Sequence, residues 1–249
     1  ERQFHHWVRT LRRGARLVVN AREDSLQRVL AKGCYSEIVR FGGKDSAGWA
    51  AVGADEHFAA HRDGETVATV DWNIIGEHNQ LNALAAMAAA EHVGVSPTQS
   101  AKALGSFENV KRRMETRGVA GGVTVYDDFA HHPSAIRTTL DGLRRKLGKS
   151  ARIAAVFEPR SNTMKLGAMA AQLPWSLESA DMALCHAGGL GWDVRAALAP
   201  MGARAVVADS IDATLLALKQ WARPGDHVVC MSNGGFGGIH AKLLEMLSK

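Results

Sequence analysis

Two adjacent carboxylates and two adjacent histidines follow a strand-like run in residues 123–133, which read Val-Thr-Val-Tyr-Asp-Asp-Phe-Ala-His-His-Pro. A strand that ends in Asp127 and Asp128 and turns directly into a helix predicts acids at the carboxyl edge of an α/β sheet, where such folds bind ligands. There, Asp128 can accept hydrogen bonds from ribose hydroxyls or help to hold a metal. Adjacent side chains diverge on a helix, and no third ligand is evident. His131 and His132 therefore favour a nucleotide contact or a turn cap over a metal pair.

A pair of amides opens the alanine-rich run at residues 76–93. Asn79 and Asn82 are three residues apart and share one face of the expected helix. Two amides on one face can recognise the donors and acceptors along the edge of a purine ring. The alternative is that each asparagine only caps the start of the helix, a position where asparagine is common.

A basic run marks the junction between the two halves of the chain, at residues 107–118. It includes Arg112 and Arg113, which are followed by Met114 and Glu115. Guanidinium groups at such a junction can bind phosphate oxygens with bidentate geometry. The alternative is a solvated, charged linker without a ligand.

Two further predicted strands end in residues that suit an anionic ligand. Residues 157–165 place cationic and polar side chains after a buried strand, namely Arg160, Ser161, Asn162 and Lys165. A simple helix cap by Ser161 or Asn162 is the alternative. Residues 231–240 carry four glycines after the last strand, which let the backbone approach a ligand and turn N–H groups toward an anion. This run does not match G-x-G-x-x-G, so the sequence does not support a dinucleotide fingerprint.

Regular elements that can position these motifs alternate clearly in residues 119–249. Strands are expected at residues 119–128, 152–158, 181–186, 203–208 and 226–231, and helices at residues 134–147, 162–179, 192–201, 211–222 and 239–247. Strands of about six residues that alternate with helices predict right-handed crossovers. The expected fold class is therefore α/β, with a doubly wound, mostly parallel sheet.

The first half follows a less regular pattern. Helices are expected at residues 4–11, 25–30, 76–93 and 97–105, and strands at residues 16–20, 36–41, 49–52, 56–62 and 65–70. Asp63 and Gly64 predict a tight hairpin turn between the last two strands. These strands look short and scattered, and the boundary between the two halves falls near residues 108–111.

Composition narrows the classes of function. The chain has 249 residues, of which 46% are hydrophobic and 22% charged, an ordinary globular composition at a length that allows two domains. A net charge of +5 favours anionic ligands, but dispersed basic residues and only two tyrosines argue against a nucleic-acid partner. Three cysteines without a Cys-x-x-Cys pair predict reduced thiols in a cytosolic protein. No apolar run approaches the roughly 20 residues of a membrane span, so no membrane partner is expected.

Taken in chain order, the motifs resemble those of the Mur ligase family. The shared motifs are G-x-H-N-x-x-N at residues 76–82, Arg-Arg-Met-Glu at residues 112–115 and Asp-Asp-Phe-Ala-His-His-Pro at residues 127–133. Members of this family are ATP-dependent, amide-forming ligases of peptidoglycan synthesis. They have an N-terminal UDP-sugar domain, a central ATPase domain and a C-terminal Rossmann-like domain. The resemblance implies that residues 1–110 are the end of the central domain and residues 111–249 the complete C-terminal domain.

The same resemblance implies a branch and a reaction. Residues 127–133 are similar to the branch whose acyl donor is UDP-N-acetylmuramate. Residues 158–165 and 232–240 are similar to members that add the recycled murein tripeptide L-alanyl-γ-D-glutamyl-meso-diaminopimelate. In the implied reaction, ATP with Mg²⁺ phosphorylates the lactyl carboxylate, and the tripeptide's amine attacks the resulting acyl phosphate. Members that add L-alanine are the alternative within the family.

Residue roles also follow from the resemblance. The implied nucleotide contacts are His78, Asn79, Asn82, Arg113, Asp128 and His131. Among these, the asparagines recognise adenine, Arg113 contacts the ATP phosphates and Asp128 lies at the ribose side, so Arg113 and Asp128 are the candidate catalytic residues. No metal ligand is assigned. The implied contacts to the incoming amine, in loops after the strands, are Arg160, Ser161, Asn162, Lys165, Ser232, Asn233 and His240.

Several parts of the family's machinery are expected outside this chain. The phosphate-binding loop, the magnesium-binding acid and the UDP-sugar domain would lie upstream of Glu1, so we expect a fragment that is inactive alone. A near match to the phosphate-binding loop, between Gly142 and Gly148, has five intervening residues instead of four. Two alternatives lie outside the family. A nucleotide-binding regulatory module would need a complete first half with its own sheet, and an NAD oxidoreductase would need a glycine fingerprint.

Overall fold

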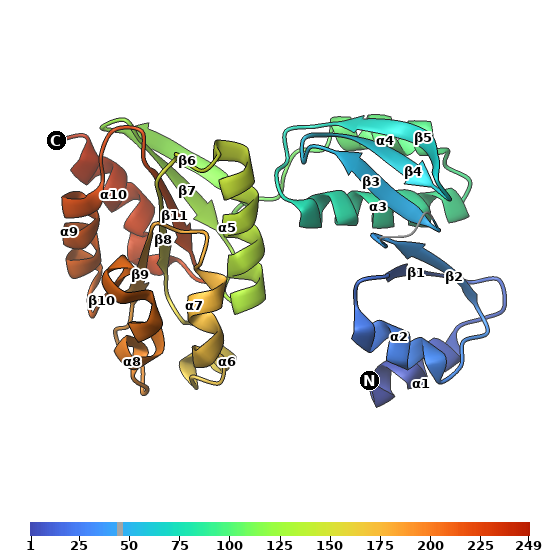
Figure 1. The fold of residues 1–249 in the computed structure, drawn as a ribbon, viewed down its shortest axis with the longest axis horizontal. Coiled ribbons are helices and arrows are strands. Elements are labelled where there is room, and N and C mark those ends of the chain that lie inside the picture. Colours follow the sequence, from blue (N-terminus) through green and yellow to red (C-terminus); the bar gives the residue numbers. More distant parts are fainter. Residues whose placement is uncertain (44–46) are drawn as a thin grey trace. The chain divides into compact units, whose positions relative to one another are not determined.

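The computed structural model describes residues 1–43 and 47–249, which form two compact units (Figure 1). Unit 1 is Glu1–Glu108 and unit 2 is Asn109–Lys249. The elements of unit 1 are α1 (Arg2–Thr10), β1 (Arg16–Asn20), α2 (Asp24–Ala31), β2 (Glu37–Phe41), β3 (Trp49–Gly53), β4 (His57–Arg62), β5 (Glu65–Asp71), α3 (Glu77–His92) and α4 (Pro97–Gly105).

The strands of unit 1 pair in their chain order. Parallel pairing joins β1, β2 and β3, and antiparallel pairing joins β3, β4 and β5. The predicted turn between β4 and β5 is confirmed, with Asp63 at φ +52° and Gly64 at φ +88°, as a tight hairpin demands. The interpretation of the short strands as scattered is wrong, because they pair into one five-stranded sheet.

Sequence features explain why the helices α3 and α4 of unit 1 form. One face of α3 buries small and apolar side chains, namely Ala83, Leu84, Met87 and Ala88. This face packs in one hydrophobic cluster with Trp49 and Phe58 of the sheet. The shorter α4 begins with a complete capping box of Ser96 and Gln99, and Pro97 occupies its first turn.

Unit 2 is built on a six-stranded sheet in the order β10-β9-β8-β11-β7-β6. Its elements are β6 (Glu115–Ala120), β7 (Val123–Asp128), α5 (Pro133–Leu147), β8 (Ile153–Phe157), α6 (Asn162–Lys165), η1 (Ala170–Gln172), α7 (Leu173–Ser176), β9 (Met182–His186), α8 (Val194–Leu198), η2 (Ala199–Arg204), β10 (Ala205–Ala208), α9 (Ile211–Trp221), β11 (His227–Met231), η3 (Phe236–Gly238) and α10 (Ile239–Leu247).

The strand pairs of unit 2 are parallel except for β6 with β7. This confirms the predicted doubly wound, mostly parallel sheet. Helices α9 and α10 lie on one face of the sheet, and α5 and α7 lie on the other (Figure 1). All five residues of β8 are buried, as expected for a strand that is covered on both faces.

Two expectations for unit 2 are wrong. The single strand expected at residues 119–128 is a hairpin of β6 and β7, because Gly121 and Gly122 adopt φ +56° and +76° and reverse the chain. The helix expected at residues 162–179 is broken into α6, η1 and α7. Gly167, at φ +70°, follows α6, and Pro174 lies in the first turn of α7, so glycine and proline interrupt an otherwise helical pattern.

The cysteines are thiols inside or beside the cores. Cys34 is half-buried, whereas Cys185 on β9 and Cys230 on β11 are buried. Burial raises the pKa of both inner thiols, which makes them poor nucleophiles. Among the helices of the described residues, none is both long and apolar enough to cross a membrane.

Leu140 provides a test of the core of unit 2. It lies on α5 and is fully buried, so Leu140→Ala is expected to cost about 3 kcal/mol of unfolding free energy through the cavity that it leaves. Leu216 on α9 is 58% exposed and serves as a matched control. Leu216→Ala is expected to cost less than about 0.5 kcal/mol. Urea denaturation followed by circular dichroism measures both, and equal losses would contradict this assignment of the core.

Candidate functional site

The carboxyl ends of β8 and β11 form the topological switch point of unit 2. After β8 the chain crosses to β9 on one side, whereas after β11 it continues into α10, which packs against β6 and β7 on the other. Open α/β sheets bind their ligands outside the strand ends at such a point. The register aligns Met231 of β11 with Phe157 of β8 and with Asp128 of β7. The residues that follow these strand ends are therefore neighbours.

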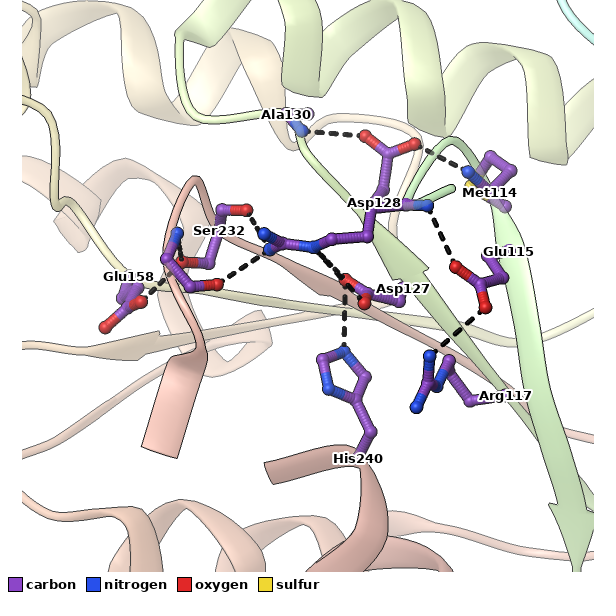
Figure 2. A network of polar contacts seen from close by, with 11 residues as sticks. Met114, Glu115, Arg117, Asp127, Asp128, Ala130, Glu158, Ser232 and His240 are labelled. Carbon is purple, nitrogen blue, oxygen red and sulfur yellow. Dashed lines mark hydrogen bonds and ion pairs between the residues drawn. The ribbon is translucent and has the colours of Figure 1, made fainter. Parts of the chain in front are cut away.

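A network of polar contacts joins these strand ends (Figure 2). Arg112 donates through Nη2 to the carbonyl oxygens of Ser232, at 2.6 Å, and Gly234, at 2.7 Å. Its Nε lies 3.3 Å from Oδ2 of Asp127. The Ser232 hydroxyl donates to Glu158, and the N–H of Gly234 donates to the same hydroxyl oxygen at 2.8 Å. One arginine thus connects the ends of β7 and β11 and, through Ser232, the end of β8.

Asp128 is buried and holds together two segments of unit 2. Its Oδ1 accepts from the N–H of Ala130 at 2.8 Å and from the Thr139 hydroxyl at 3.2 Å, and its Oδ2 accepts from the N–H of Met114 at 2.8 Å. Burial raises the pKa of this carboxyl group, and the three hydrogen bonds oppose that shift. With 3% of the residue exposed, Asp128 fixes the approach to α5 and the segment before β6.

His240 lies on α10, not in a loop, and joins the same network. Its Nε2 is 3.3 Å from Oδ1 of Asp127, in an orientation that makes no hydrogen bond. Burial lowers the pKa of His240, and the Asp127 carboxylate opposes this shift. The charges of Arg117 and Arg112 lower the pKa further, and that of Glu115 raises it. The neutral imidazole is therefore favoured more strongly than in an exposed histidine.

The two adjacent histidines make local contacts. Nδ1 of His131 lies 2.8 Å from the carbonyl oxygen of Phe129, and the two rings meet edge to face. His132 is the N-cap of α5, where its Nδ1 accepts from the N–H of Ser134. The capping interpretation is therefore confirmed for His132. Across residues 1–43 and 47–249, no group of three or more His, Cys, Asp or Glu side chains is placed to hold a metal.

Arg160 and the glycine-rich loop (residues 232–238) lie against each other at the switch point. A Cβ added to Gly234 would be 2.5 Å from Cζ and Nε of Arg160, so the guanidinium occupies the space beside this glycine. The Arg160 side chain is 53% exposed and lies 3.9 Å from Glu158. Oδ1 of Asn233 is buried without a hydrogen-bond partner among the described residues. An exposed cation and an unsatisfied amide oxygen together can receive a polar ligand.

The other predicted amine contacts take different positions. Ser161 is the N-cap of α6 and accepts from the N–H of Met164 at 3.3 Å, which confirms the capping alternative for this serine. Asn162 and Lys165 are exposed on that short helix. Ser232 is buried in the network, so its hydroxyl acts on Glu158 and on its own loop.

The predicted adenine contacts lie in unit 1, on the first turns of α3. Nδ2 of Asn82 is 3.4 Å from Oδ1 of Asn79, so the two amides share one face, as predicted. Asn79 also donates to the carbonyl oxygen of Ile75 at 2.7 Å. The N-cap position belongs to Gly76, so neither asparagine caps the helix. The ring of His78 packs beside Gly76, where an added Cβ would come within 2.5 Å of it.

Comparison with known proteins shows the family and supports the fold. Residues 112–234 match the family model described as the Mur ligase, glutamate ligase domain. Over its whole length the chain is 46% identical to UDP-N-acetylmuramate–L-alanyl-gamma-D-glutamyl-meso-2,6-diaminoheptandioate ligase of Escherichia coli strain K12. The chain belongs to the Mur ligase family. It spans about half the length of the curated relatives that it matches, 55% of this one.

Further Mur ligases support the same assignment. The crystal structure of a murein peptide ligase from Psychrobacter arcticus matches the whole chain with a TM-score of 0.75 and 39% identity, and the chain covers 54% of it. The UDP-N-acetylmuramate–L-alanine ligase of Anaeromyxobacter dehalogenans strain 2CP-1 is 33% identical over 77% of this chain, which covers 43% of that protein. The Rossmann-like character of unit 2 that the resemblance implied is confirmed by these relatives.

Sequence reasoning missed two members of this Mur ligase network, Arg112 and Glu158. Of the two adjacent arginines, Arg113 is exposed with its guanidinium 5.6 Å from the Phe129 ring centre, whereas Arg112 turns inward toward Asp127. Arg112 does so at φ +60°, which the sequence does not reveal. A signal did exist for Glu158, because it is the first charged residue after a wholly apolar strand.

The lowered pKa of His240 predicts a pH dependence of stability. Because burial disfavours the imidazolium, the folded state binds this proton less tightly than the unfolded chain. The stabilisation by neutral His240 is fully present above the ordinary pKa of 6.5 and is lost as the pH falls through the lowered value. The stability difference between the wild type and His240→Gln should therefore shrink on acidification below pH 6.5. Urea midpoints across this range measure it, and a growing difference would show instead that His240 ionises against Asp127.

Proposed function

We propose that the protein containing this chain is an ATP-dependent ligase that joins L-alanyl-γ-D-glutamyl-meso-diaminopimelate to UDP-N-acetylmuramate. The observation that carries the proposal is 46% identity, over all of this chain, to a relative named for that reaction. The switch point of unit 2 adds chemical support, because it combines the exposed cation Arg160 with a loop rich in glycine. The unpaired cysteines are consistent with a reaction in the cytoplasm.

The proposed chemistry has two steps. The γ-phosphate of ATP is transferred to the lactyl carboxylate of UDP-N-acetylmuramate, which gives an acyl phosphate and ADP. The tripeptide's α-amine then attacks the acyl carbon, loses a proton and expels phosphate as the amide bond forms. Mg²⁺ would stabilise charge on the phosphates, and we expect its ligands mainly outside this chain. The protein's contribution is mainly positioning and charge stabilisation.

Residues of both units have proposed roles toward the nucleotide. Asn79 and Asn82 would recognise adenine, since they share one face at the start of α3, with His78 beside them. In unit 2, the exposed Arg113 would contact phosphate oxygens, and His131 would be a further nucleotide contact. Asp128 would act on the ribose side through the backbone segments that it fixes, because both its carboxylate oxygens already accept hydrogen bonds within unit 2.

The amine substrate is the point on which the family divides. A tripeptide that ends in diaminopimelate carries several carboxylates, whereas L-alanine has a single one beside the reacting amine. Two exposed cations, Arg160 and Lys165, follow β8 at the carboxyl edge and suit the additional carboxylates. Other polar residues at this edge would support the two cations through a helix cap, the geometry of the loop and unsatisfied polar atoms. They are Ser161, Asn162, Ser232, Asn233 and His240. L-alanine addition remains the second candidate function, since relatives named for it share 33% identity.

A substrate comparison tests the proposed function. The natural-length protein should form the amide with the tripeptide at a kcat/KM at least about 100-fold above that with L-alanine, a difference of about 2.7 kcal/mol in transition-state binding. Phosphate release coupled to ATP and UDP-N-acetylmuramate measures both reactions. A preference for L-alanine would assign the protein to the second candidate, and no turnover with either amine would refute the ligase.

A glycine substitution tests Arg160 without removing it. Gly234→Ala would put a methyl group 2.5 Å from the Arg160 guanidinium, which must move away. The KM for the tripeptide should rise about 10-fold through a lost charge-assisted contact. Gly235→Ala is the matched control, because a Cβ there meets nothing within 4 Å. Its KM should stay within about twofold of the wild type, and equal effects of the two variants would contradict a role for Arg160.

A further inference from the structure

The side chain of Arg112 binds the backbone of the glycine-rich loop at two points. Its Nη2 donates to two carbonyl oxygens of that loop, those of Ser232 and Gly234, at 2.6 and 2.7 Å. Its Nε lies 3.3 Å from Oδ2 of Asp127, whose side chain is only 7% exposed. The guanidinium is therefore anchored by a buried carboxylate at one end and grips the loop backbone at the other.

The glycine-rich loop needs contacts from outside the loop to fix its conformation. Residues 234–238 include four glycines, which have no side chain to pack and the widest backbone freedom of any residue. Gly237 and Gly238 adopt φ +55° and +70°, which other residues rarely adopt. At the start of the loop, the Ser232 hydroxyl accepts from the N–H of Gly234 at 2.8 Å. The two bonds from Arg112 to the same stretch fix the carbonyl side of this turn.

The backbone conformation of Arg112 directs its side chain toward the glycine-rich loop. Arg112 adopts φ +60°, a conformation that is unfavourable for a residue other than glycine. Its N–H donates to Oε2 of Glu115 at 2.9 Å, and its carbonyl oxygen accepts from the N–H of Phe129 at 2.8 Å. Glycine is the residue best suited to this φ, so the presence of arginine indicates that the side chain compensates for the strain.

We propose that Arg112 is a positioning residue for the amine substrate, since it fixes the glycine-rich loop in the conformation that receives the amine. This inference rests on the proposed function. Arg112 itself is mostly buried, with 28% of its side chain exposed, and its Nε and Nη2 are directed to groups of the protein. It acts through the loop and through Asn233, whose buried Oδ1 lacks a partner among the described residues.

Arg112→Gly is the decisive variant. Glycine accepts φ +60° without strain, so the variant removes the guanidinium while it relieves the backbone. Arg112→Lys keeps a charge for Asp127 but cannot reproduce the planar, two-ended contact, so it should show an intermediate effect. Arg117→Met is the matched control, because Arg117 is 44% exposed and, among the described residues of unit 2, forms an ion pair only with Glu115.

Two measurements on the natural-length protein test the inference. Amide hydrogen exchange in residues 232–238 should be about 10-fold faster in Arg112→Gly and unchanged in Arg117→Met. The KM for the tripeptide should rise about 10-fold, while kcat and the KM values for ATP and UDP-N-acetylmuramate stay within about twofold.

The outcomes separate this inference from the proposed function. Unchanged exchange in the loop overturns the inference whatever the enzyme's activity. Faster exchange with an unchanged tripeptide KM, or an equal rise in all three KM values, also overturns it, because the role would then be structural only. Absence of ligase activity in the wild type would refute the proposed function, and the exchange measurement would still decide whether Arg112 fixes the loop.

Discussion

The position of β11 between β7 and β8 is the constraint on which the site of unit 2 depends. β11 is the last strand in the chain, yet it pairs in parallel with both neighbours and aligns Met231 with Asp128 and Phe157. Strands that are buried on both faces tolerate no slip of register, because a shift by one residue exchanges their two faces. This register brings residues from three distant parts of the sequence to one edge, where Glu158 and Ser232 meet.

The buried carboxylates at this edge of the sheet impose a second constraint, because each must find a partner inside the protein. Asp127 and Asp128 are almost inaccessible to solvent, and buried carboxylates need charge or hydrogen-bond partners. The two are satisfied differently. Asp128 accepts from backbone N–H groups and a hydroxyl, whereas Asp127 lies beside Arg112 and His240. Of these two neighbours of Asp127, Arg112 also holds the glycine-rich loop. The charge balance at the sheet edge and the geometry of the loop are therefore connected.

The sequence predicts the architecture of unit 2 well, because alternating apolar strands and helices leave few arrangements. The prediction from sequence fails where the course of the chain depends on an unusual backbone conformation. The Gly121-Gly122 reversal lies inside a continuous strand-like pattern, and Gly167 breaks a helical one. The site shows the same limit. Sequence locates Asp128 at the strand end, but it does not reveal that the carboxylate faces the N–H groups of its own unit. It also does not reveal that Arg112, not Arg113, turns inward, since this depends on a positive φ.

The central claim is that the amine substrate binds at the carboxyl ends of β8 and β11. A crystal structure of the natural-length protein with the murein tripeptide bound tests it most directly. Our account predicts a tripeptide carboxylate within hydrogen-bond distance of the Arg160 guanidinium, with the backbone of residues 232–238 against the ligand. A tripeptide bound at full occupancy away from both strand ends would contradict it.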